Sequence, residues 1–177
     1  MPEKKTKSLK LNLGCGDDIR QGYLNLDKED LDLNVFPYRL NGNIIKDNSI
    51  DEILLYRVID HLDEPLQVIS ELKRILKPDG ILKIIVSHKS RSDAFSIAHK
   101  YQTNYNSLIN ICRKWGFNII HSRIIFGKTY KIFEPIFNRL RKIYEFSFLQ
   151  SLIPALEINI VLSKKTFEND RKKFNYL

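Results

Sequence analysis

The sequence is poor in the residues and segments that mark secreted and membrane-spanning proteins. It has two cysteines, Cys15 and Cys112, among 177 residues, too few for the disulfide framework of a secreted domain. Residues 1–7 are mostly polar and charged and do not resemble an apolar leader. No apolar stretch approaches the roughly 20 residues that cross a bilayer. We therefore expect a cytoplasmic protein with free thiols.

Signs of common nucleic-acid-binding modules are also missing, although the net charge is +8. There is no arginine-rich run, no zinc-finger spacing and no aromatic–glycine strand signature. A basic solvated surface, an anionic substrate or an acidic membrane surface explains the charge equally well. No His/Cys/Asp/Glu group has metal-ligand spacing, so no metal site is predicted. The length suits a single domain spanning residues 1–177.

Short apolar runs alternate with segments of helical periodicity, as is typical of an α/β sheet. Residues 81–86 are almost continuously apolar, which predicts a central parallel strand buried on both faces. The last two expected strands form an antiparallel pair at one edge. Strands are expected at 8–13, 23–27, 51–56, 81–86, 117–126 and 155–162, with helices at 64–76 and 105–114.

The connection between the first two strands is unusually short. Only residues 14–22 separate them, whereas a crossover between parallel strands normally takes a dozen residues or more. Either the first helix is reduced to about one turn, or the strand boundaries lie a few residues away from those expected.

A glycine loop follows the first strand, and an acid follows the second. Gly14 and Gly16 would let a ligand approach the backbone closely. The carboxylate of Asp27 can accept both hydroxyls of a ribose. Alternatively, Asp27 caps the turn that follows it. The loop alone therefore indicates a nucleotide-like ligand without identifying it.

Several ordered stretches between residues 8 and 126 together resemble the class I S-adenosylmethionine-dependent methyltransferases. The similarity is closest to the short bacterial and archaeal "LNLGCG" group. It implies a Rossmann-like, doubly wound α/β fold with a mostly parallel sheet and an antiparallel last strand. It also implies S-adenosylmethionine as cofactor. The stretches are NLGCG at 12–16, GYLNLD at 22–27, DLNVFPY at 32–38, KDNSIDEI at 46–53, RVIDHL at 57–62 and ELKRILKPDGIL at 71–82.

The resemblance also implies which residues contact the cofactor. Gly14 and Gly16 would pack against its amino-acid and ribose parts, and Asp27 would hold the ribose hydroxyls. Asp32 and Leu33 would meet the adenine. The full set implied is Asn12, Gly14, Cys15, Gly16, Asp27, Asp32, Leu33 and Arg57, with Arg57 near the methionine end.

Three positions depart from the family pattern. Asn12 stands where an acid is usual, Arg57 replaces a histidine, and Asp60 replaces a glutamate. The helix that usually precedes the first strand is also missing, so the cofactor cleft is expected to be open, or covered by a second copy or a partner. These departures support an alternative hypothesis, a catalytically silent cofactor-binding or scaffold subunit.

Methyl transfer needs mainly the in-line placement of an acceptor against an electrophilic sulfonium. A general base helps when the acceptor loses a proton, and His88 and His61 are the candidates. His88 follows a buried strand at the edge where α/β sheets bind ligands. His61 could instead cap or pack in its turn. We expect a small-molecule, sugar or lipid-linked acceptor; an RNA methyltransferase is less favoured. An NAD-type site is disfavoured because the third glycine of its motif is replaced by Ile19.

Residues 127–154 resemble the family least and are predicted to be a lid or specificity insertion. Apolar residues recur there at helical spacing, with cations largely on the other face. The segment could simply pack on the sheet as an extra helix, or cover an anionic or lipid-linked acceptor. Residues 128–148 could also contact an acidic membrane surface. Residues 164–177 are predicted to be a charged tail.

Overall fold

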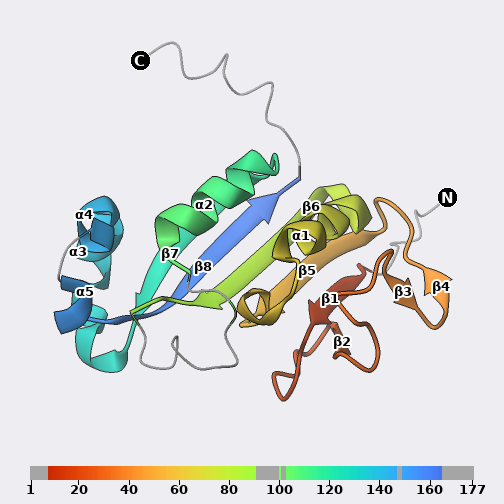
Figure 1. The fold of residues 1–177 in the computed structure, drawn as a ribbon, viewed down its shortest axis with the longest axis horizontal. Helices are drawn as coiled ribbons and strands as arrows, with labels where there is room; N and C mark the ends of the chain where they lie inside the picture. Colours follow the sequence, from red (N-terminus) through yellow and green to blue (C-terminus); the bar gives the residue numbers. More distant parts are fainter. Residues whose placement is uncertain (1–7, 91–99, 101–102, 147–148, 165–177) are drawn as a thin grey trace, which may run out of the picture.

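The structure is a computed structural model that describes residues 8–90, 100, 103–146 and 149–164 (Figure 1). Its centre is a six-stranded sheet of order β2-β1-β5-β6-β8-β7. The strands are β1 (Lys10–Leu13), β2 (Leu24–Leu26), β5 (Ile50–Tyr56), β6 (Leu76–Ser87), β7 (Asn118–Phe126) and β8 (Ala155–Ser163).

Strands β2, β1, β5 and β6 are mutually parallel, and β8 is antiparallel to both of its neighbours, β6 and β7. The predicted α/β fold class, with a mostly parallel sheet and an antiparallel last strand, is confirmed. Except at the start of β6, the strand ranges expected from the sequence agree with the structure to within two residues at each end.

The short connection between β1 and β2 contains turns and no helix, so it is shorter than the one-turn helix that was one of the two alternatives. Side-chain amides hold this loop in place. Asn12 Nδ2 donates to the carbonyl of Asp18 at 2.6 Å and to Asn25 Oδ1 at 2.9 Å. The backbone N–H of Arg20 donates to the same Asn25 oxygen at 2.8 Å. These bonds satisfy backbone groups that a helix would otherwise have paired.

Two helices lie beside the central strands, and their starts differ. Helix α1 (Pro65–Ile75) begins with proline, which tolerates the first helical turn. Helix α2 (Tyr105–Lys114) starts at Asn104, whose side chain accepts a hydrogen bond from Ser107 N at 2.8 Å. It ends before Gly116, whose φ is +72°.

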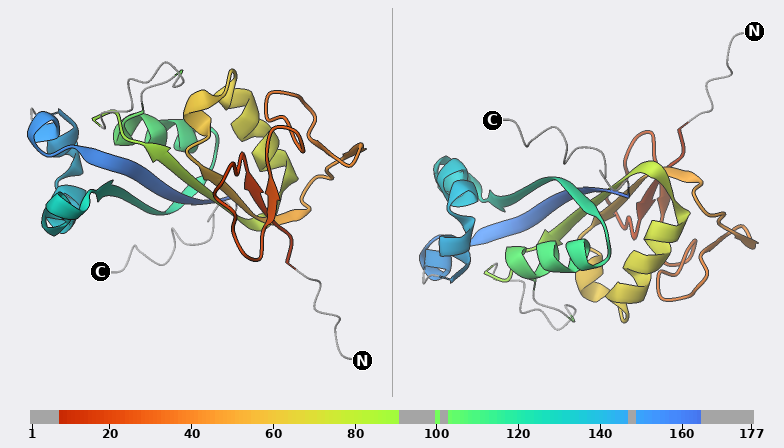
Figure 2. Two further views of the ribbon diagram at one scale, coloured as in Figure 1. Left: turned by 90° about the horizontal axis from the view of Figure 1, so that it is seen from below. Right: turned by 90° about the horizontal axis from the view of Figure 1, so that it is seen from above.

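Both helices lie on the same face of the sheet (Figure 2). On that face Leu82, Ile84 and Val86 of β6 are fully buried. On the opposite face Ile81, Lys83 and Ile85 are only half-buried, so the prediction that this strand is buried on both faces is wrong. We call the opposite surface the open face; it includes Lys10, Asn12, Glu52, Leu54, Ile81, Lys83, Ile85, Asn159 and Val161.

The transition from α1 into β6 also differs from the expected one. The helix ends at Ile75, and β6 begins at the next residue. The residues Lys77–Gly80 that were expected to separate them form a bulge within the strand, because Ile50 pairs with Leu76 and Glu52 already pairs with Ile81. A small hairpin of β3 (Arg39–Leu40) and β4 (Asn43–Ile44) was not expected. Its Asn41-Gly42 turn has positive φ at both residues.

The segment between β7 and β8 folds into short helices at the left end of the molecule in Figure 1. They are η3 (Lys128–Phe133), α3 (Glu134–Arg139), α4 (Arg141–Phe146) and α5 (Leu149–Leu152). Two predicted parts lie outside the described residues: the charged tail from residue 165 onward, and Phe148 at the end of the stretch 128–148 that was expected to contact a membrane. Among the described helices, none combines the length and apolar character needed to cross a membrane.

Candidate functional site

The chain reverses its direction across the sheet between β1 and β5. From β1 it moves outward to β2 and then returns past β1 to β5, and ligands of open α/β sheets bind at such a switch point. A cavity of about 270 Å³ lies there, at the carboxyl ends of these strands. It is lined by Gly14, Asp27, Lys28, Leu31, Asp32, Leu33, Asn34, Val58, His61, Leu62, Asp63 and Lys100. We call this the switch-point cavity.

Gly14 is a position where the structure has no room for a side chain. Its φ is +64°, and a Cβ atom added there would lie 2.8 Å from Cγ2 of Val58, another residue of the cavity wall. The N–H groups of Gly14 and Cys15 both donate to the carbonyl of Leu26, at 2.8 and 3.2 Å. The loop therefore offers close approach at Gly14, while these two donors are used to bind β2.

Asp27 faces the cavity with its carboxylate unused. Its backbone carbonyl accepts from Asp30 N at 3.0 Å and from Leu31 N at 2.9 Å. The side chain that caps the turn is that of Asp30, which accepts from Asp27 N at 3.1 Å. The Asp27 carboxylate accepts no hydrogen bond from any described residue. A carboxylate in this state suits a ligand with two adjacent hydroxyls.

Asp32 and Leu33 line the same cavity and are held by local hydrogen bonds. Asp32 Oδ1 accepts from Asn34 N at 2.9 Å, which leaves its second oxygen for another donor. The carbonyl of Leu33 accepts from the buried hydroxyl of Tyr38 at 3.2 Å. The structure thus brings together Gly14, Asp27, Asp32 and Leu33, four of the residues that the sequence pointed to.

The remaining wall is polar and of mixed charge. His61, in η1 (Ile59–His61), lines the cavity with its side chain 40% exposed. Lys100 forms an ion pair with Asp63, and its N–H donates to the carbonyl of Asp60 at 2.8 Å. Lys100 lies outside the family-like stretches of the sequence, whereas Val58 lies within RVIDHL at 57–62 but was assigned no contact with the ligand.

Four other predicted residues lie outside the cavity lining. Asn12 is fully buried beneath the loop, and Arg57 turns away to bind Glu157 of β8, with its Nε 2.8 Å from the carboxylate. Gly16 lies in the exposed part of the loop. Burial, and then the negative charge of Asp27, raise the pKa of the Cys15 thiol, so this thiol stays neutral.

His88 is also separated from the cavity. It is fully buried, and its Nε2 donates to Glu145 Oε1 of α4 at 3.0 Å. Its Nδ1 accepts from the backbone N–H of Ser90 at 3.1 Å. The ring therefore joins the end of β6 to the helical segment. Of the two candidate histidines, only His61 borders the cavity.

A second cavity, of about 350 Å³, lies between α1 and α2. Its lining is mostly aliphatic and includes Leu66, Ile69, Leu108 and Ile111. It is larger than the switch-point cavity, but it lacks a cluster of convergent polar groups. The chemistry therefore favours the switch-point cavity as the functional site.

The residues at the switch-point cavity fit S-adenosylmethionine. Any side chain at residue 14 would occupy the space beside the loop, which glycine leaves open to the cofactor. The Asp27 carboxylate is available to a ribose. The carboxylate of Asp32 can meet the adenine amino group, and the lining includes a cation, Lys28, that can pair with a carboxylate of the ligand.

Comparison with known proteins gives one family match. The family model described as "Methyltransferase domain" matches residues 18–84. No curated protein matches the sequence significantly.

Solved structures of methyltransferases share the fold. A putative S-adenosylmethionine-dependent methyltransferase from Listeria monocytogenes aligns with a TM-score of 0.59 at 11% identity, over 90% of this chain and 92% of that chain. A methyltransferase from Archaeoglobus fulgidus aligns with a TM-score of 0.59 at 12% identity, over 90% and 87%.

A third similar structure comes from a complex of the Haloferax volcanii Trm112 activator with a putative methyltransferase. The TM-score is 0.58 at 12% identity, over 93% of this chain and 85% of that chain. The family model covers residues 18–84 and the solved structures share the fold, so this chain is similar to methyltransferases in that stretch of sequence and in its architecture.

Proposed function

We propose that the switch-point cavity binds S-adenosylmethionine and that the chain transfers its methyl group to a small-molecule, sugar or lipid-linked acceptor. The observation that carries the proposal is the Asp27 carboxylate, which lines the cavity and is not used by the turn around it. In this assignment Asp27 accepts the ribose hydroxyls. Asp32 and Leu33 hold the adenine, and Gly14 leaves room for the chain of the cofactor.

The bound cofactor would supply a methyl carbon that is already strongly electrophilic, so the protein mainly positions the acceptor. His61 borders the cavity and is the residue we assign to accept a proton when the acceptor carries one. His88 would act on the acceptor only if α4 moved away from it. We assign it instead to holding the wall beside the site.

Calorimetric titration with S-adenosylmethionine tests the binding proposal. Asp27→Ala should weaken the affinity by at least about tenfold, because two hydrogen bonds to a charged group are lost. Glu29→Ala, an exposed carboxylate two residues away, should leave the affinity unchanged. NAD should not bind. Equal affinity of the Asp27 variant and the parent chain would contradict this site.

The alternative, a catalytically silent cofactor-binding or scaffold subunit, remains a second candidate. It is favoured by Arg57, whose guanidinium is engaged by Glu157, and by the likeness to an activator-bound methyltransferase. The cyclase SpnF, with a TM-score of 0.60 at 15% identity over 92% of this chain and 76% of that chain, shows that this fold also occurs in a cyclase. Incubation with labelled cofactor and fractionated cell extract separates the two: a labelled product that disappears with Asp27→Ala supports the enzyme.

A further inference from the structure

The helical segment between β7 and β8 exposes several large aliphatic side chains within about twenty residues of sequence. We call this set, with its neighbouring cations, the insert surface. Its five aliphatic side chains are between 46% and 76% exposed. They are Ile132, Ile136, Leu140, Ile143 and Leu152.

The exposed charge on the same segment is entirely positive among the described residues. Four cations, Lys128, Lys131, Arg139 and Lys142, are exposed. The two acids of the segment do not balance them: Glu145 is buried, and Glu134 is half-buried, its carboxylate 3.4 Å from Phe126 N.

These side chains are presented by a segment that is firmly packed on its other side. The Phe137 and Tyr144 rings pack in a tilted arrangement with their centroids 5.1 Å apart, and both contact the Phe126 ring of β7. Asn138 Nδ2 and Oδ1 bond the carbonyl and N–H of Ile124 in β7. The inward side of these helices is thus packed against β7, and the aliphatic exposure is a property of the folded segment.

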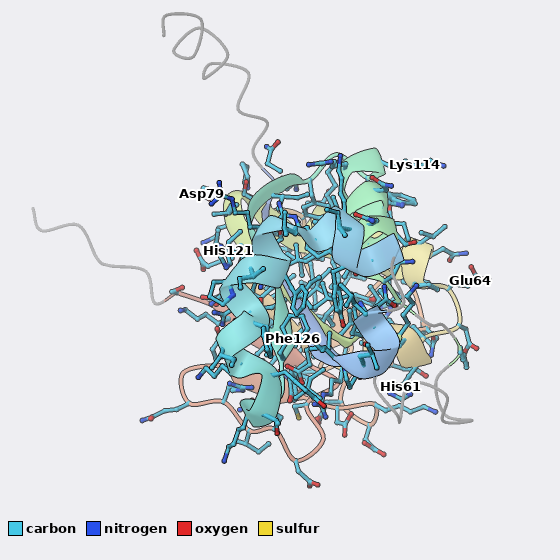
Figure 3. The ribbon with its side chains drawn as sticks, turned by 90° about the vertical axis from the view of Figure 1, so that its left-hand side faces the viewer. His61, Glu64, Asp79, Lys114, His121 and Phe126 are labelled. Carbon is cyan, nitrogen blue, oxygen red and sulfur yellow. The ribbon has the colours of Figure 1, made fainter. Side chains whose placement is uncertain are left out.

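The insert surface lies at the same edge of the sheet as the switch-point cavity. Strand β8 runs antiparallel to β6, and Glu157 near its start pairs with Ser87 at the end of β6. The helical segment that precedes β8 in the sequence therefore lies beyond the carboxyl ends of the parallel strands. Figure 3 views the molecule from this end, with the helices of the segment in front and His61 at the lower right.

We propose that the insert surface docks on the anionic face of a lipid membrane. Exposed aliphatic side chains in one segment with exposed lysine and arginine are the composition of a segment that lies in a membrane interface. Each cation near an anionic leaflet contributes about 1 kcal/mol to binding. A second copy of the chain fits less well, because a two-fold contact through this surface would place cations against cations without an exposed carboxylate to pair them.

Co-sedimentation with lipid vesicles tests the proposal and needs no cofactor, so it succeeds or fails independently of the proposed function. The purified chain is mixed with phosphatidylcholine vesicles, with and without phosphatidylglycerol. We expect binding to the anionic vesicles that is at least about tenfold stronger than to the neutral ones and that weakens with added salt.

Two variants of the surface and two matched controls sharpen the test. Ile136→Ser/Ile143→Ser removes apolar contact, and Lys131→Gln/Lys142→Gln removes charge; each should reduce vesicle binding about tenfold or more. The controls, Ile120→Ser on β7 and Lys114→Gln at the end of α2, change equally exposed residues elsewhere and should bind as the parent does. Unchanged thermal midpoints show that the variants are folded.

Three results would overturn the proposal. One is equal sedimentation with neutral and anionic vesicles, and another is undiminished binding by both double variants. The third is a dimer in size-exclusion chromatography that the Ile136→Ser/Ile143→Ser change converts to a monomer, which would assign the surface to contact between copies of the chain.

Discussion

At the scale of single residues, Asn12 shows how a departure from a family pattern can be structural. Its amide nitrogen donates to the carbonyl of Asp18 and to Asn25, and an acid at this position has no N–H with which to make these bonds. The loop between β1 and β2 contains no helix, so hydrogen bonds from the Asn12 side chain hold part of the loop in place instead of helical hydrogen bonds. Asn12 is therefore weak evidence against catalysis, because its amide is explained by the loop.

The two glycines of this loop allow a matched prediction. Gly14→Ala should lower the free energy of unfolding by about 2–4 kcal/mol, because it combines a positive φ with a clash against Val58. Gly16→Ala meets no atom within 4 Å, so only the backbone strain of about 1–2 kcal/mol remains. Chemical denaturation measures both.

Cofactor titration of the same variants tests whether Gly14 faces the ligand. Gly14→Ala should weaken S-adenosylmethionine binding more than Gly16→Ala does. Val58→Ala, added to Gly14→Ala, should restore part of the lost stability by removing the clashing methyl groups. Equal effects of the two glycine changes on stability and binding would argue against the special role of Gly14.

At the scale of elements, helix α4 is tied to the rest of the molecule by a buried carboxylate. Glu145 Oε1 accepts from His88 Nε2 at the end of β6 and from the backbone N–H of Tyr105 at the start of α2, at 3.0 and 3.1 Å. One side chain thus joins three elements in a place without water access. Buried groups of this kind are costly to leave unpaired.

Glu145→Ala should therefore lower the free energy of unfolding by about 3–5 kcal/mol, because it leaves His88 Nε2 and the Tyr105 N–H buried without their acceptor. Glu145→Gln keeps an acceptor oxygen and should cost less. Denaturant titration provides the measurement, with Glu134→Ala as the half-buried control. Full stability of Glu145→Ala together with loss of methyl transfer would instead indicate that the histidine and its partner act in catalysis.

At the scale of the whole molecule, the described residues form two layers, with both long helices on one side of the sheet. The open face carries charges in the middle of its strands. Glu52 accepts the hydroxyl of Tyr23 and pairs with Lys10 and Lys83 across three strands. Burying such a network under a third, apolar layer would be unfavourable, so the side-chain pattern suits contact with water.

This network makes a pH prediction. Burial by itself would raise the pKa of Glu52, but hydrogen bonds from Lys10, Lys83 and Tyr23 outweigh it and lower the pKa from 4.5 to about 2. A carboxylate with a lowered pKa in the folded state stabilises the protein above pH 4.5, and this stability is lost as the pH falls toward 2.

Glu52→Gln should thus remove on the order of 1–2 kcal/mol at neutral pH and flatten the loss of stability between these pH values, after allowance for the exposed lysines. Chemical denaturation at several pH values measures this, with exposed Glu29→Gln as control. An unchanged acid dependence in Glu52→Gln would show that other carboxylates dominate, among them Asp51, whose pKa is lowered by Lys77.

Much of the fold was predictable because strand order and helix position follow local signals. The apolar run at residues 51–56 and the helical periodicity at 105–114 mark elements without help from the rest of the chain. The bulge at 77–80 was not predictable, because proline and glycine usually end an element and only the pairing of β6 with β5 keeps these residues in a strand. The place of Asp27 in the switch-point cavity was predictable from the sequence, whereas the contact of Val58 with Gly14 was not.

The helical segment shows the same limit. Its apolar residues recur at helical spacing, which predicts one stripe facing the sheet. The structure divides them instead: Phe137 packs inward beside Tyr144, while Ile136 and Ile143 face outward. The periodicity of apolar residues indicates an amphipathic helix, but it does not predict which of the apolar side chains pack against the core.

By itself, the sequence determined the α/β class, the glycine loop, the acid at residue 27 and the shortened first connection, because each depends on residues close together in the chain. Only the tertiary structure decided that His88 is buried against Glu145, that His61 borders the cavity and that one face of the sheet is open. These outcomes depend on contacts between residues far apart in the chain, such as the 57 positions that separate His88 from Glu145.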